Sequence, residues 1–255
     1  MKKTFVSEIQ VRKEICEYGQ KLYDKGFVAA NDGNISAKIS EDIIIVTPTG
    51  VSKGGMKPDD LVKMRLSGEI LSHGAKPSSE VKMHIEVYNK CHKLKAVVHA
   101  HPPMSTAFAV ARKPLDRPIL SEAIMTLGVV PVAEYAKPGT DEVPQSISGY
   151  VLDYNAVLLA NHGLLTWGED LQQAFFRMES AEHYSKILHN LELIGGAKEL
   201  DCSEVNELVN IRESWGVTTG GAPPCDVNRS GITKSDEQTL VEEITKRVMQ
   251  HLEKR

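Results

Sequence analysis

The run AVVHAHPP, residues 96–103, places an apolar strand directly before two histidines and two prolines. Side chains alternate between the two faces of a strand, so His99 and His101 project from the same face and can bind one ion together. The prolines then end the strand, because proline cannot donate a hydrogen bond to a neighbouring strand. A third histidine, His162, follows the apolar run 156–160 at the same kind of strand edge.

Three imidazoles suit zinc and leave one coordination position for water or substrate, which is the pattern of catalytic zinc sites. The alternative is that these are ordinary strand-end histidines, since histidine is often buried or satisfied at a surface. An HxH pair alone is a weak signal for a metal. The third histidine, after a second apolar strand, is what favours a metal site.

Helices and strands alternate along the chain. The clearest predicted helices run from Ser7 to Gly26, from Ser79 to Lys90 and from Asp170 to about Gly195, and the clearest strands are 43–46, 96–98 and 156–160. We therefore expect an α/β protein with a sheet flanked by helices. The order of elements alone does not fix whether the strands are parallel or antiparallel.

Composition excludes several classes of protein. A chain of 255 residues with 41% apolar and 25% charged residues is typical of one sizeable globular domain. The net charge of -4 gives no general attraction to nucleic acid or to an anionic membrane. No apolar run approaches the ~20 residues of a membrane span, and the first residues lack the apolar core of a secretory signal, so we expect a cytoplasmic protein.

The cysteines lack the CxxC spacing of a thiolate zinc site, and their scatter predicts no disulfide framework: Cys16, Cys91, Cys202 and Cys225.

Three short stretches contain candidate phosphate ligands: Gly33-Asn34, Thr49-Gly50 and Ser78-Ser79. The serines come at the start of a predicted helix, where unpaired N–H groups and the helix dipole favour an anion. The alternatives are a plain N-cap for Ser78 and plain turns at the glycines. Glu80 follows in the first predicted helical turn, where it either favours the dipole or acts as a base beside the metal.

Five motifs, in their order along the chain, resemble the class II aldolase and adducin-head family: GNIS at 33–36, TPTG at 47–50, PSSE at 77–80, HAH at 99–101 and NHG at 161–163. The resemblance runs from about Ser7 to Trp215. It implies a three-layer α/β/α sandwich around a mainly antiparallel sheet. It also implies a homotetramer with active sites between neighbouring subunits.

Motif by motif, the resemblance implies a role for each candidate residue. The implied zinc ligands are His99, His101 and His162, and Glu80 is the residue that ligates resting zinc and then acts as acid and base. The implied phosphate ligands are Asn34, Thr49, Gly50, Ser78 and Ser79. The implied activity is cleavage of a ketose 1-phosphate, of the L-fuculose or L-rhamnulose type, to dihydroxyacetone phosphate and lactaldehyde.

Two positions need separate interpretation: Glu122 departs from the fuculose-phosphate aldolases of that family, and Trp215 can be interpreted in two ways. Glu122 stands where those aldolases carry a tyrosine that donates a proton, and we predict that a carboxyl with a raised pKa takes that role. The alternative is a different substrate or a dehydratase. Trp215 is either the C-terminal aromatic residue over the substrate or a packing residue. The epimerases of the family carry aspartate where Glu80 stands, which counts against an epimerase.

The enzymatic alternatives act on other phosphorylated ketoses: methylthioribulose-phosphate dehydratase, 5-deoxyribulose-phosphate aldolase and 3-oxo-tetronate-4-phosphate decarboxylase. A non-catalytic scaffold of the adducin type is the alternative from another class. The complete histidine set argues against a scaffold, because a scaffold has no need of it.

We predict a catalytic domain over 1–215, a flexible Gly/Pro-rich linker over 216–234 and an amphipathic helix over 235–255. One stripe of that helix is apolar: Leu240, Val241, Ile244, Val248 and Leu252. This arrangement resembles the peptides that dock enzymes to bacterial microcompartment shells, and so predicts a shell protein as partner. The alternative is a helix that folds back onto the tetramer. A membrane-surface role is disfavoured, because the helix has no Trp or Phe anchor.

Overall fold

The computed structural model describes residues 5–225 of the chain. Their strands form one sheet in the spatial order β3-β2-β1-β4-β7-β6-β5. The strands are β1 (Asn34–Lys38), β2 (Ile43–Val46), β3 (Val62–Arg65), β4 (Ala96–Ala100), β5 (Val132–Ala133), β6 (Ala156–Leu159) and β7 (Gly163–Gly168). Within this sheet β5 and β6 pair in parallel and all other neighbours are antiparallel.

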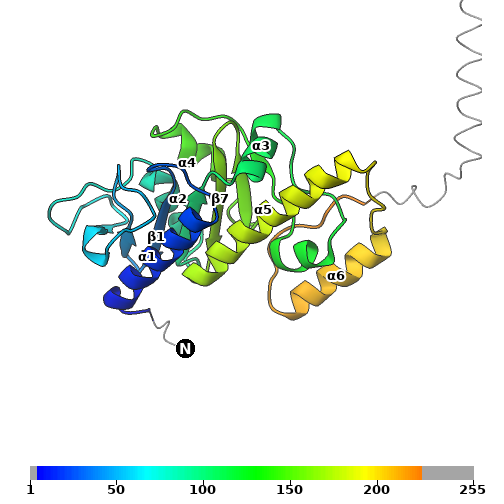
Figure 1. Cartoon of the computed structure of the whole chain (residues 1–255). Coiled ribbons are helices and arrows are strands. Elements are labelled where there is room, and N and C mark those ends of the chain that lie inside the picture. The colour runs from blue at the N-terminus through cyan, green and yellow to red at the C-terminus, as the bar shows by residue number, and fades with distance from the viewer. Residues whose placement is uncertain (1–4, 226–255) are drawn as a thin grey trace, which may run out of the picture.

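Helices cover both faces of the sheet. The α-helices are α1 (Glu8–Asp24), α2 (Val81–Lys90), α3 (Pro103–Ala111), α4 (Glu142–Ile147), α5 (Leu171–Leu193) and α6 (Cys202–Ser214). Two short turns of other helix types are η1 (Pro58–Asp60) and η2 (Ala123–Leu127). Figure 1 shows α1 and the long α5 together on one face.

Alternation along β4 builds the two hydrophobic layers. Val98 joins the core formed with α1, α3 and α5, whereas its neighbour Val97 joins the core formed with α2 and α4. This is the two-residue period of a strand buried on both faces. The predicted three-layer α/β/α sandwich around a mainly antiparallel sheet is therefore confirmed.

Side-chain caps start α1 and α5 where the sequence indicates. Ser7 Oγ accepts a hydrogen bond from the backbone N–H of Gln10, and a carboxylate oxygen of Asp170 accepts one from that of Gln173.

The start of α2 differs from the prediction by two residues, because the helix begins at Val81 rather than Ser79. The backbone N–H of Ser78 donates to the Thr47 carbonyl, at 3.2 Å, and Ser78 Oγ accepts from the backbone N–H of Glu80, at 3.3 Å. These bonds hold Ser79 and Glu80 in a turn that belongs to the strand-end loop.

The prediction of no disulfide is wrong, because Cys202 and Cys225 form one. The spacing of cysteines in a motif reveals only pairs that are close in sequence. These two cysteines are 23 residues apart in sequence, and the return of the chain after α6 brings them together. On that return, the Gly220 carbonyl accepts a hydrogen bond from the backbone N–H of Val129, at 2.7 Å. Residues 216–225, the described part of the predicted linker, thus lie against the rest of the described structure.

The rest of the predicted linker and the predicted helix over 235–255 lie outside the described residues, and the domain boundaries stay predictions. Among residues 5–225, no helix has both the length and the apolar content that crossing a membrane requires.

Candidate metal and phosphate site

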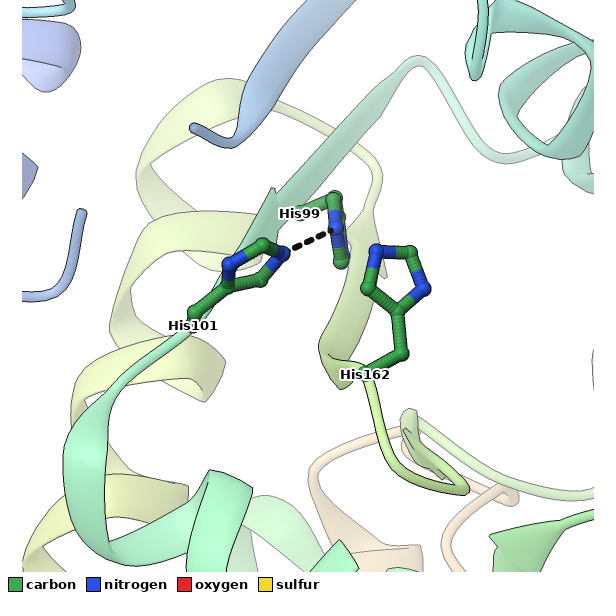
Figure 2. A group of neighbouring side chains, drawn as sticks. All are labelled: His99, His101 and His162. Carbon is green, nitrogen blue, oxygen red and sulfur yellow. Dashed lines mark hydrogen bonds between the residues drawn. The ribbon is translucent and has the colours of Figure 1, made fainter. Parts of the chain in front are cut away.

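Three histidines meet at one edge of the sheet. His99 lies near the end of β4, His101 one residue beyond that strand, and His162 in the turn between β6 and β7. One ring nitrogen from each lies within 4.8 Å of the others. Figure 2 shows the three rings facing one another, and the Nε2 atoms of His99 and His101 are 3.1 Å apart. Nitrogen atoms this close, from three imidazoles, fit the ligand set of a catalytic zinc site.

Hydrogen bonds behind the rings orient them. His99 Nδ1 lies 3.0 Å from the carbonyl oxygen of Leu164 on β7. A carbonyl oxygen only accepts, so Nδ1 carries the proton and Nε2 presents its lone pair to the centre of the cluster. His101 Nδ1 lies 3.4 Å from the Asp32 carboxylate. Such partners behind the ligands are typical of metal-binding histidines.

The charge states of the cluster also suit a cation. Burial lowers the pKa of His99 well below its ordinary value, and burial together with His162 lowers the pKa of His101. Both imidazoles are therefore neutral, which is the form that binds metal.

Glu80 lies against the same cluster as a carboxylate. Its Oε1 is 3.0 Å from His162 Nε2, and its Oε2 is 3.6 Å from His99 Nε2 and accepts a 2.7 Å hydrogen bond from the Asn34 amide. Burial alone would raise the pKa of the Glu80 carboxyl, but His99, His162 and Asn34 together hold that pKa well below its usual range.

Two glycines allow the loops to approach β4 this closely. A Cβ added to Gly163 would lie 2.6 Å from the Ala100 carbonyl oxygen and 2.6 Å from Cδ2 of His101. At Gly33, where φ is +74°, a Cβ would lie 2.8 Å from the His99 carbonyl oxygen. Both positions therefore require glycine.

A cavity of about 220 Å³ opens directly beside the histidines. Its lining contains every predicted phosphate ligand together with Glu80 and two of the histidines: Asn34, Thr49, Gly50, Ser78, Ser79, Glu80, His101 and His162. Backbone bonds join the loops, because the N–H of Thr49 donates to the Lys76 carbonyl at 3.0 Å. Asn34 Oδ1 is buried and has no hydrogen-bond partner among the described residues, so it is available to a ligand.

Glu122 and Trp215 lie elsewhere. Glu122 precedes η2, is exposed and is absent from the lining of that cavity within residues 5–225. Trp215 is 60% exposed and lines a second cavity, of about 370 Å³, beside Phe176 of α5. The roles predicted for both residues stay predictions.

Sequence reasoning missed three residues that support the site. Asp32 stands behind His101, Gly163 makes room for the histidines, and Lys53 donates to two loop carbonyls beside the cavity. Asp32 adjoins the motif at 33–36 and Gly163 is the last residue of the motif at 161–163, so both positions carried a usable signal. Nothing local marks Lys53 as a link between the two loops, because Asn31, its partner in the other loop, is 22 residues away.

Comparisons with known proteins agree with this geometry. The profile of the family described as Class II Aldolase and Adducin N-terminal domain matches residues 13–189. The 3-oxo-tetronate 4-phosphate decarboxylase of Escherichia coli (strain K12) is 35% identical over 71% of this chain and 87% of its own length.

Two further relatives are named aldolases. The 5-deoxy-D-ribulose 1-phosphate aldolase of Bacillus thuringiensis serovar kurstaki is 33% identical over 80% of this chain and 96% of its own. A solved structure named L-fuculose 1-phosphate aldolase superposes with a TM-score of 0.74 at 30% identity, over 84% of this chain and 99% of its own.

Proposed function

This chain belongs to the class II aldolase and adducin family, and from that premise we propose that it is a zinc-dependent lyase that breaks a carbon–carbon bond of a phosphorylated ketose. The observation that carries the proposal is the single cavity that joins the histidine cluster, Glu80 and the candidate phosphate ligands. A metal held by His99, His101 and His162 would supply Lewis-acid polarisation of the substrate carbonyl.

We propose aldol cleavage of a ketose 1-phosphate as the first reaction. The C4 hydroxyl gives its proton to a base, which returns it to water, while the C3–C4 bond breaks and its electron pair stays on C3. Glu80, a carboxylate in the free site, takes up a proton from water when the substrate binds and delivers it to C3, so that a 6-deoxyketose 1-phosphate gives dihydroxyacetone phosphate and lactaldehyde. The Asn34 amide holds Oε2 of Glu80 at 2.7 Å, so the other oxygen faces the histidine cluster.

The phosphate is expected at the other end of the cavity. Ser78 and Ser79 offer hydroxyl groups before α2, and the Thr49-Gly50 turn offers the Thr49 hydroxyl and the backbone N–H of Gly50. The loops carrying these groups are joined by the bond from Ser78 to Thr47, so the donors are fixed before a ligand arrives.

Decarboxylation of a 3-oxo-tetronate 4-phosphate is the second candidate, and the position of Glu122 favours it. Aldol cleavage needs a group to take the C4 hydroxyl proton, and Glu122 is exposed and away from the cavity of its own chain. In the homotetramer that we propose, a neighbouring subunit would have to supply it. Loss of carbon dioxide from a 3-oxo acid needs no such group, since only the carbon that loses carbon dioxide must be protonated, and Glu80 can do this.

The two reactions yield one common product and differ in the other. We would incubate the zinc-loaded protein with a panel of ketose 1-phosphates and with a 3-oxo-tetronate 4-phosphate, and assay dihydroxyacetone phosphate in every case. An aldehyde identifies aldol cleavage and carbon dioxide identifies decarboxylation. The His99→Ala variant is the control, because it lacks one of the proposed ligands. Failure of every substrate to give dihydroxyacetone phosphate would contradict the proposal.

A further inference from the structure

Lys53 is a buried lysine beside the phosphate end of the cavity. Its side chain is among the largest that are fully buried, with 1% of the residue exposed. Nζ donates to the Asn31 carbonyl at 3.0 Å and to the Val51 carbonyl at 2.7 Å. Asn31 begins the loop that leads to Asn34, and Val51 directly follows the Thr49-Gly50 turn. One ammonium group therefore joins two of the loops that line the cavity.

The backbone of Lys53 is itself held firmly against α1. A Cβ added to Gly54 would lie 2.6 Å from the ring of Tyr23, so helix and loop are in close contact there. The backbone N–H of Gly55 donates to Gln20 Oε1 at 2.9 Å. Because the loop is fixed on α1, the side chain extends from a rigid base, and its two hydrogen bonds can hold the cavity loops in place.

The surroundings of Lys53 leave its charge only partly compensated. Burial lowers the pKa of Lys53 to about 8, against the opposing effects of Asp32 and Glu80. Those two carboxylates are the charged groups that act on it. Each also has closer partners, because Asp32 lies 3.4 Å from His101 and Glu80 lies 3.0 Å from His162. An anion in the cavity would add the charge that the ammonium lacks.

Resting on the proposed function, we propose that Lys53 is a positioning residue for the substrate phosphate. Its ammonium group holds the carbonyls of Asn31 and Val51, so that the two loops keep the spacing that the phosphate requires. Its positive charge acts from behind the cavity wall and favours the anion. Lys53 touches neither the reacting carbon nor the metal ligands, so it affects binding of the substrate rather than the bond-breaking step.

The test compares Lys53→Met and Lys53→Gln with Lys57→Met, which removes the same charge from an exposed position in the same segment. The first readout is hydrogen exchange of loops 31–34 and 48–51 with no ligand present. We expect faster exchange in both loops for the Lys53 variants and wild-type exchange for Lys57→Met. This readout does not depend on any enzymatic activity.

The second readout is the Kd of inorganic phosphate, measured from pH 7 to 9.5. In the wild type, affinity falls as Lys53 loses its proton near pH 8. In Lys53→Met, phosphate binds roughly tenfold more weakly at pH 7, because one positive charge behind the cavity wall is lost, and the fall of affinity near pH 8 is absent. With a turned-over substrate, KM rises while kcat and zinc content stay near the wild-type values.

Unchanged loop exchange or an unchanged Kd in a folded Lys53 variant would overturn the proposal. So would equal losses of kcat and zinc, or failure of both variants to fold, because Lys53 would then serve the stability of the whole body. If the wild type binds phosphate with this pH dependence but cleaves no substrate in the panel, the proposed function fails and the inference about Lys53 stands.

Discussion

Substitution of Gly163 by alanine tests whether close packing sets the geometry of the histidine cluster. The new Cβ would lie 2.6 Å from both the Ala100 carbonyl oxygen and Cδ2 of His101, and 3.3 Å from Cε1 of His99, whereas ordinary contact begins at 3.4 Å. The backbone or the imidazole must therefore move by more than half an ångström. Zinc–nitrogen bonds tolerate about 0.2 Å. We expect zinc affinity to fall about 10–100-fold and the free energy of unfolding to fall by about 1–3 kcal/mol.

The assay is zinc titration against a competing chelator, with thermal unfolding of the metal-free protein measured in parallel. Gly149→Ala is the matched control, because a Cβ there meets no atom within 4 Å and the backbone φ lies outside the range that favours glycine. Wild-type zinc affinity in a folded Gly163→Ala protein would refute the reasoning, since the close contacts would then have relaxed without displacing either histidine.

Four further outcomes are expected. Glu80→Gln should keep zinc and lose about 10²–10⁴-fold in turnover, because an amide cannot transfer the proton; near-normal turnover contradicts this. Ser78→Ala with Ser79→Ala should raise KM for phosphorylated substrates only, as a comparison with unphosphorylated ketoses checks. Glu122→Gln should slow aldol cleavage but leave decarboxylation unchanged, measured through the aldehyde and carbon dioxide. Truncation after Gly231 should leave cleavage intact and abolish co-localisation with microcompartment shells. Loss of cleavage would argue against a shell protein as the partner of the C-terminal helix.

The sequence predicts those parts of the structure that depend on short, regular spacings between residues. The two-residue repeat of a strand is enough to place His99 and His101 on one face, and cap spacing is enough to start α1 and α5. Contacts between distant segments leave no such trace. The Cys202–Cys225 disulfide and the bonds of Lys53 depend on how loops return to the body.

The two ends of the cavity are held by different kinds of structure, and we expect them to respond differently to amino-acid substitutions. His99 lies on β4, in the middle of the sheet, between β1 and β7. The phosphate end is made of loops and turns, whose spacing depends on a few long-range bonds such as those of Lys53. Loops change more readily than central strands. Substitutions in the loops should therefore alter which phosphorylated substrate binds and leave the metal in place, whereas substitutions beside β4 should affect metal and fold together.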